Sequence, residues 1–290
     1  MLALSVPGEK RLAYGLWRYG EKETDRAVEM LSLARETGID HFDTADAYGG
    51  PGEFGGCERM LGSVRQRAPE LFKGAVLATK IGIEPGSPYN SSPEYLTAAC
   101  EASLARLKVE CIDLLYIHRP DLLTHPGELA RTLDGLVASG KVAAVGVSNF
   151  TTAEFDALSR FMRTPISAHQ LEFSAGHVEP LFDGTLDQAM EYGAALAAWS
   201  PLAGGRLGGG EATPAITRVR DVLQRIAERA AVPPVAAALA FVKSHPAPIT
   251  PIIGTKNPQR LRECLKANDC ALSRAEWYAV VEACRGERMP

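Results

Sequence analysis

Short apolar runs alternate with amphipathic segments along most of the chain. The apolar runs predict strands at residues 12–16, 39–42, 75–79, 112–117, 142–147, 166–168, 194–198 and 249–253. Strands that are apolar without alternation are typical of parallel sheets, which are buried on both faces. Between the strands, apolar positions recur at helical spacing. The pattern therefore predicts a strand followed by a helix, repeated eight times.

The intervening segments predict helices with recognisable ends. They lie at residues 24–38, 57–67, 95–107, 128–139, 152–162, 186–192, 215–230, 234–244, 258–267 and 274–284. Thr24 is the expected N-cap of the first helix and Gly38 its stop, and Ser92 is the expected N-cap of the third. Eight such repeats predict a closed (β/α)8 TIM barrel. Because no linker divides the chain, residues 1–290 are expected to form a single domain, with a small hairpin at residues 1–10.

Net charge, apolar runs and cysteine spacing limit the binding partners and compartment that we expect. The net charge of −4 provides no basic field for nucleic acid or an anionic membrane. No window approaches eighteen apolar residues, and the first ten residues lack the apolar run of a signal peptide. The six cysteines form no C-x-x-C pair, so we expect free thiols, no metal site and a cytoplasmic protein.

Polar residues cluster where the predicted strands end. Asp43 and Tyr48 follow the second strand, Lys80 the third and His118 the fourth. Strands five, six, seven and eight are followed by Ser148 and Asn149, Gln170, Trp199 and Ser200, and Gly254. Because a closed parallel barrel gathers the carboxyl ends of its strands around one mouth, we expect these side chains to meet there.

The first four residues suggest acid catalysis. A buried Lys80 ammonium requires a partner, and Asp43 on the adjacent strand is the obvious one, although such a pair also fits a purely structural role. The Lys80 charge is expected to lower the pKa of Tyr48 from about 10, which would make the phenol a general acid. His118 could orient a carbonyl oxygen, or be an ordinary structural histidine.

The remaining strand ends could bind a flat amide-bearing ring. Trp199 offers an aromatic face for stacking, and Ser148, Asn149 and Gln170 offer groups suited to a carboxamide. The same residues also fit core packing and the capping of loops and helices.

Two later segments suit phosphate. Residues 200–210 are rich in glycine and are expected to be flexible enough to fold over a pyrophosphate. Gly254, Thr255 and Lys256 precede a predicted helix N-terminus, where anions bind readily. Lys256 and Arg260 add charge suited to a 2′-phosphate, or lie on a solvated surface.

Together these motifs resemble the aldo-keto reductase superfamily, in particular its bacterial general oxidoreductases, from about residue 11 to about residue 264. The resemblance rests on Phe42-Asp43-Thr44-Ala45, Tyr48-Gly49, Thr79-Lys80, Tyr116-Ile117-His118-Arg119-Pro120-Asp121, Gly146-Val147-Ser148-Asn149-Phe150, Trp199-Ser200-Pro201-Leu202 and Pro251-Ile252-Ile253-Gly254-Thr255. It implies NADPH-dependent reduction of a small-molecule aldehyde or ketone, without a metal.

The resemblance also implies roles. Tyr48 would donate the proton, Lys80 would lower its pKa, Asp43 would hold Lys80 and His118 would position the carbonyl. The cofactor contacts would be Ser148, Asn149 and Gln170 at the nicotinamide amide, Trp199 at its ring, Ser200, Leu202 and Gly204 at the pyrophosphate, and Gly254, Thr255, Lys256 and Arg260 at the 2′-phosphate.

Two departures from the family pattern concern binding. Cys264 stands where many members carry an asparagine that contacts adenine. This departure bears on the affinity for the cofactor, not on which cofactor is bound. The chain ends soon after its last helix, so a long C-terminal substrate loop is short or absent and an open pocket is expected. Tyr14, Trp17 and Tyr89 are candidates to line that pocket.

Two other functions use the same residues. A cofactor-binding accessory or regulatory subunit would need the barrel and the cofactor contacts with little turnover. A lyase would use Lys80 as a Schiff-base nucleophile, which a nearby Asp43 disfavours because it keeps the amine charged.

Overall fold

The structure, a computed structural model, describes residues 12–290, so the predicted hairpin at residues 1–10 lies outside it. The strands follow one another from β1 to β8 in the order of a closed barrel, and the pairings from β1 to β6 are parallel. This topology confirms the predicted (β/α)8 fold. Within the barrel, the described residues form two compact units.

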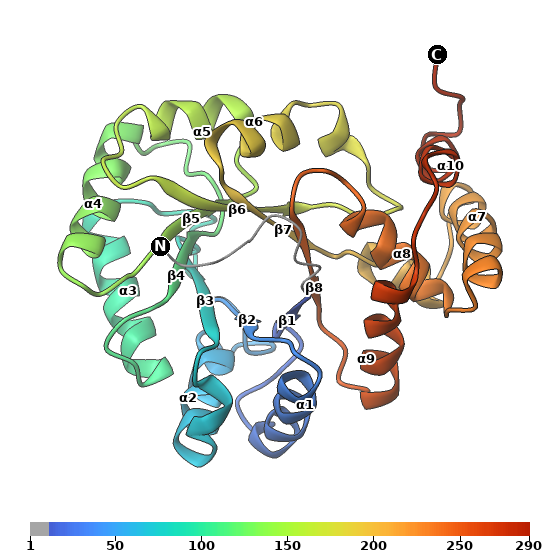
Figure 1. Ribbon diagram of the computed structural model, residues 1–290. Coiled ribbons are helices and arrows are strands. Elements are labelled where there is room, and N and C mark those ends of the chain that lie inside the picture. The colour runs from blue at the N-terminus through green and yellow to red at the C-terminus, as the bar shows by residue number, and fades with distance from the viewer. Residues whose placement is uncertain (1–11) are drawn as a thin grey trace. The chain divides into compact units, whose positions relative to one another are not determined.

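The first unit contains Ala13–Gln170 and Gly193–Ala195. Its elements are β1 (Ala13–Gly15), α1 (Thr24–Glu36), β2 (His41–Asp43), α2 (Gly56–Arg67), a 3-10 turn (Pro69–Phe72), β3 (Val76–Ile81), α3 (Pro93–Leu107), β4 (Leu114–Ile117), α4 (Pro126–Ala138), β5 (Val145–Ser148), α5 (Thr152–Ser159) and most of β6 (Ile166–Glu172). In Figure 1, helices α1 to α4 lie outside the strands that they connect.

A large ring lies among small side chains in the strands of this unit. Tyr116 of β4 is buried among small side chains from the neighbouring strands, including Ala78, Ala144 and Ala168. Gly146 of β5 makes room for it, because a Cβ there would lie 2.7 Å from the Tyr116 ring and 2.8 Å from the Ala168 carbonyl oxygen. The strands can therefore close around the ring only with small neighbours.

The second unit holds Leu171–Tyr192 and Leu196–Pro290. Its elements are a 3-10 turn (Glu179–Leu181), α6 (Thr185–Tyr192), β7 (Ala195–Trp199, whose first residue belongs to the first unit), the 3-10 segment η3 (Ala203–Gly208), α7 (Pro214–Ala230), α8 (Pro234–Lys243), β8 (Ile249–Ile253), α9 (Pro258–Leu265), a 3-10 turn (Lys266–Asp269) and α10 (Arg274–Arg285). Helices α7 and α10 pack side by side (Figure 1).

Helix α10 is fixed to α8 by an aromatic contact. The Trp277 ring stacks on Phe241 with centroids 5.1 Å apart, and its indole nitrogen donates to the Phe241 carbonyl oxygen at 3.2 Å. The indole thus satisfies its polar group while its rings pack against Phe241.

Some predicted boundaries were wrong. Glu23, not Thr24, is the N-cap of α1, and Thr24 is already helical. Strand β3 continues through Lys80 to Ile81, and β6 runs through Gln170 to Glu172, because parallel pairing with their neighbours persists past the apolar runs. The N-cap at Ser92 is confirmed, since its hydroxyl accepts from the Tyr95 amide.

Two predictions from composition can also be compared with the structure. All six cysteines are free thiols, as expected. None of the helices within residues 12–290 is long and apolar enough to cross a membrane.

Candidate active site

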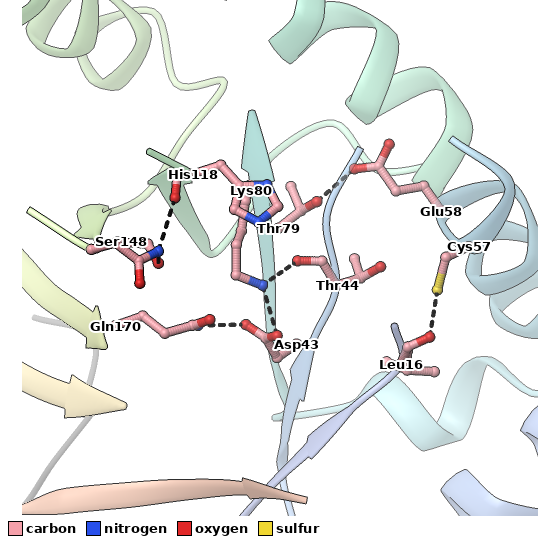
Figure 2. A network of polar contacts seen from close by, with 11 residues as sticks. Leu16, Asp43, Thr44, Cys57, Glu58, Thr79, Lys80, His118, Ser148 and Gln170 are labelled. Carbon is pink, nitrogen blue, oxygen red and sulfur yellow. Dashed lines mark hydrogen bonds and ion pairs between the residues drawn. The ribbon is translucent and has the colours of Figure 1, made fainter. Parts of the chain in front are cut away.

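Lys80 places a buried ammonium against Asp43. The Lys80 side chain is 1% exposed, and its Nζ donates to Asp43 Oδ2 at 2.7 Å and to the Thr44 carbonyl oxygen at 2.8 Å. Figure 2 shows the ammonium between these two acceptors. The predicted ion pair is therefore present, and it is enclosed by protein rather than exposed on the surface.

Strand register explains this contact. Asp43 at the end of β2 is paired with Ala78, two residues before Lys80, so their side chains leave adjacent strands on the same face. The chain beyond β2 keeps following β3, because the Thr44 amide donates to the Ala78 carbonyl and the Asp46 amide to the Lys80 carbonyl. These bonds carry the chain from Asp43 toward Tyr48 alongside Lys80.

Tyr48 lies next to both Lys80 and His118. Lys80 Nζ is 5.0 Å from the centroid of the Tyr48 ring, and the His118 ring meets the Tyr48 ring edge to face with centroids 5.7 Å apart. The Tyr48 carbonyl accepts from the Cys57 amide at the start of α2. The structure therefore brings together the four residues Asp43, Tyr48, Lys80 and His118, as predicted.

The net pKa shift of Tyr48 is opposite to the one predicted. Burial raises the pKa of Tyr48, and although the Lys80 charge acts to lower it, burial prevails. Burial also acts to lower the pKa of Lys80, but Asp43 and Tyr48 outweigh it and leave that pKa raised. The sequence identified the cation beside the phenol but not the extent of burial. In this structure Lys80 is charged and Tyr48 keeps its proton.

His118 is a neutral, buried imidazole. Burial, followed by the charges of Lys80 and Arg119, lowers the pKa of His118 to about 3. Its backbone is fixed at both polar groups: the amide donates to the Ile81 carbonyl, and the carbonyl accepts from Asn149 Nδ2. No residue between 12 and 290 hydrogen-bonds to its buried Nδ1. The ring can thus offer a hydrogen bond without carrying a charge.

Three predicted cofactor contacts lie beside this group. Gln170 Nε2 donates to Asp43 Oδ1 at 2.8 Å, so Asp43 bridges Lys80 and Gln170 (Figure 2). Asn149 has a φ of 59°, and its side-chain amide donates to the Ser148 hydroxyl at 2.8 Å. A left-handed asparagine is a local strain of the kind that concentrates at functional sites. The Gln170 amide nitrogen is engaged by Asp43, which the sequence did not indicate.

In the second unit, residues 200–210 form a turn that contains η3. Half-buried Trp199 ends β7, Ser200 has a φ of 49°, and η3 then runs through Gly204, whose φ is 69°. Leu202 precedes η3, and Arg220 of α7 fixes the turn by donating from Nε to the Arg206 carbonyl at 2.8 Å. Arg220 thus contacts this glycine-rich segment from a separate helix.

The segment from Gly254 to Arg260 leads into α9. Asn257 caps this helix by accepting from the Gln259 and Arg260 amides, at 2.9 Å and 3.2 Å. These two amides are therefore hydrogen-bonded to a side chain. The Thr255 hydroxyl accepts from the Asn257 amide at 3.1 Å.

Cys264 is 3% exposed on α9, and burial raises the pKa of its thiol to about 12. It is an inert, packed thiol.

The residues predicted to line a substrate pocket differ in exposure. Tyr14 is fully buried with its hydroxyl 2.7 Å from that of Tyr19, which argues against a direct ligand contact. Trp17 and Tyr89 are exposed.

Sequence reasoning missed two groups around the site. The Thr44 carbonyl was overlooked because a backbone acceptor has no sequence signature. Glu58 of α2 is fully buried and accepts from Thr79. Its position beside the apolar residues Cys57, Met60 and Leu61 was the available signal.

No group of metal-ligating side chains suited to an ion occurs within residues 12–290. Tyr48 and His118, one a protonated phenol and the other a neutral imidazole, can instead present hydrogen-bond donors to one substrate atom. Lys80 provides a fixed positive charge beside the phenol. The arrangement can give a proton to an oxygen that gains negative charge.

The chain is similar to known proteins over nearly its whole length. A sequence model of the aldo/keto reductase family matches residues 11–285. A 6-dehydroglucose reductase of Novosphingobium aromaticivorans is 44% identical over 96% of this chain and 93% of that protein. A second 6-dehydroglucose reductase, from Agrobacterium fabrum, is 33% identical over 96% of this chain and 95% of that protein.

The fold has solved counterparts. The crystal structure of the thermostable aldo-keto reductase Tm1743 with the inhibitor epalrestat superposes with a TM-score of 0.81 over 94% of each chain. At 23% identity this likeness concerns the fold alone.

The lowered pKa of His118 predicts a specific loss of stability in acid. The unfolded histidine takes up a proton near pH 6.5 whereas the folded one stays neutral, so stability falls as pH falls below that value. Between pH about 7.5 and about 5.5, wild type should lose about 1.4 kcal/mol more unfolding free energy than a His118→Gln variant in urea titrations. Parallel losses in the two proteins would contradict the buried neutral imidazole.

Proposed function

Since the chain belongs to the aldo/keto reductase family, we propose that it reduces an aldehyde or ketone to an alcohol with NADPH as the reductant. The observation that carries this proposal is the convergence of a buried Lys80–Asp43 pair with Tyr48 and His118. A buried ammonium is costly, and its place beside a phenol gives it a chemical purpose.

Tyr48 is the proton donor in this proposal. It keeps its proton at neutral pH because burial raises its pKa, and it releases the proton only when negative charge develops on the carbonyl oxygen. The Lys80 ammonium stabilises the phenolate that remains, and Asp43 keeps the ammonium in place. Neutral His118 donates a hydrogen bond to the same oxygen and orients the carbonyl.

NADPH, when bound, supplies the hydride that the carbonyl carbon accepts. We assign its carboxamide to Ser148, Asn149 and Gln170, and its ring to Trp199. The left-handed backbone at Asn149 and Ser200 supports this assignment. The pyrophosphate would contact Ser200, Leu202 and Gly204, and the 2′-phosphate would meet Gly254, Thr255, Lys256 and Arg260.

The relatives suggest a substrate class. Two proteins similar to this chain are named 6-dehydroglucose reductases, one of them 44% identical. We therefore propose a sugar that carries an aldehyde, with 6-dehydroglucose as the first compound to test. A Schiff-base role for Lys80 is disfavoured, because the raised pKa keeps its amine protonated.

Replacing the proton donor tests the reaction. Tyr48→Phe should lower kcat for reduction of 6-dehydroglucose or a simple aldehyde by at least about a hundredfold, measured as NADPH oxidation, since a general acid is lost. Tyr19→Phe removes another buried phenol, 1% exposed, and should keep wild-type kcat. A Tyr48→Phe enzyme with wild-type turnover would refute the assignment.

Replacing Lys256 tests the cofactor preference. Lys256→Ala should raise the Kd for NADPH about tenfold and leave the Kd for NADH nearly unchanged, because only NADPH carries the 2′-phosphate. Titration of cofactor fluorescence measures both values. Lys266→Ala removes an exposed lysine after α9 and should change neither. Equal weakening of both cofactors would exclude a contact between Lys256 and the 2′-phosphate.

A further inference from the structure

A buried carboxylate behind the candidate active site has no part in the proposed reaction. Glu58, on the first turn of α2, is 0% exposed and uses both of its oxygens. Oε1 accepts from the Thr79 hydroxyl at 2.6 Å, and Oε2 from Arg106 Nε of α3 at 2.6 Å. Figure 2 shows Glu58 reaching from its helix to Thr79. Two short hydrogen bonds hold this buried carboxylate in one position.

One of these contacts lies next to Lys80. Thr79 is the residue before Lys80 on β3, and consecutive strand residues point to opposite faces. Lys80 therefore points toward Asp43, whereas Thr79 points toward α2. A hydrogen bond at Thr79 restrains the part of β3 from which the Lys80 side chain extends.

The backbone next to Glu58 is hydrogen-bonded to Tyr48. Cys57, the residue before Glu58, donates its amide to the Tyr48 carbonyl at 3.0 Å. The Gly55 amide donates to the Asp46 carbonyl at 2.6 Å, which closes the loop that carries Tyr48. The first turn of α2 thus holds the Tyr48 loop by its backbone and β3 by the Glu58 side chain.

We propose that Glu58, acting through the Thr79 hydroxyl, is a positioning residue that sets the separation between the Lys80 ammonium and the Tyr48 phenol. The proposal rests on the proposed function, since this separation matters only if Tyr48 donates a proton. Neither Glu58 nor Thr79 touches the reacting atoms.

The neighbours of Glu58 hold its carboxylate in place. Arg106 pairs with it and also donates to the Ser103 hydroxyl at 3.1 Å. A Cβ on Gly55 would lie 2.6 Å from Arg106 Cδ. The glycine therefore leaves room for the Arg106 side chain beside the loop that carries Tyr48. Burial, followed by the Glu58 charge, raises the pKa of Asp46 well above its usual range.

Thr79→Val tests the proposal because it removes the hydroxyl and keeps the shape of the side chain. We expect kcat to fall about tenfold, as for a misplaced catalytic group. The Kd for NADPH, read by cofactor fluorescence, should stay within about twofold of wild type. Thr79→Ser keeps a hydroxyl at this position and should retain most of kcat.

Thr37→Val is the matched control. It removes a hydroxyl that donates to the Leu33 and Ala34 carbonyls at 2.9 Å, far from β3 in the sequence, and it should behave as wild type.

Crystal structures provide a measure that does not depend on turnover. In Thr79→Val, Lys80 Nζ should move by about 0.5 Å or more relative to the Tyr48 ring, whose centroid lies 5.0 Å away in the present structure. An unchanged separation, a wild-type kcat in Thr79→Val, or an equal loss in Thr79→Ser would overturn the proposal. If Thr79→Val does not fold, Thr79→Ala carries the same comparison.

Failure of the proposed function gives a different result. In that case wild type would oxidise no NADPH with any carbonyl, and Tyr48→Phe would match it. Failure of the positioning role would leave wild type active, Tyr48→Phe inactive and Thr79→Val unaffected.

Discussion

The ion pair between Lys80 and Asp43 is the interaction on which the candidate site depends. Taking an ammonium and a carboxylate out of water is costly, and the cost is recovered only if the remaining polar groups are satisfied. Here Asp43 accepts from both Lys80 and Gln170, and Lys80 also donates to the Thr44 carbonyl. The pair therefore ties β2, β3 and β6 together, and removal of one partner should cost about 3–5 kcal/mol.

Burial sets the charge of the groups around this pair. The same exclusion of water that makes the ion pair costly keeps Tyr48 protonated and His118 uncharged. The result is a paired cation beside two neutral side chains that can donate hydrogen bonds. Such an environment favours negative charge on an oxygen placed between them, because no mobile solvent has to reorganise. Buried Glu58 of α2 pairs with Arg106 of α3 and accepts from Thr79, so it connects α2 to the same strand.

The sequence was informative where a strand ended in an unusual side chain. Apolar runs followed by Asp43, Lys80 and His118 indicated both the barrel and the convergence of these residues, because parallel strands present their carboxyl ends together. The pKa of Tyr48 could not be predicted in this way, since burial depends on packing by distant elements. Glu58 lies inside a helix, and only its contact with Thr79 reveals its role. The contact of Arg220 with the Arg206 carbonyl likewise has no signature in residues 200–210, because Arg220 lies in a separate helix.

If the proposed function is right, the buried ammonium serves the chemistry of Tyr48 rather than the stability of the barrel. The direct test is the double variant Asp43→Asn/Lys80→Met, which replaces the ion pair by neutral groups of similar size, with unfolding free energy and kcat measured on the same preparation. We predict an unfolding free energy within about 2 kcal/mol of wild type and a kcat at least about a hundredfold lower. A double variant that turns over carbonyl substrate at the wild-type rate would contradict this role for the ion pair.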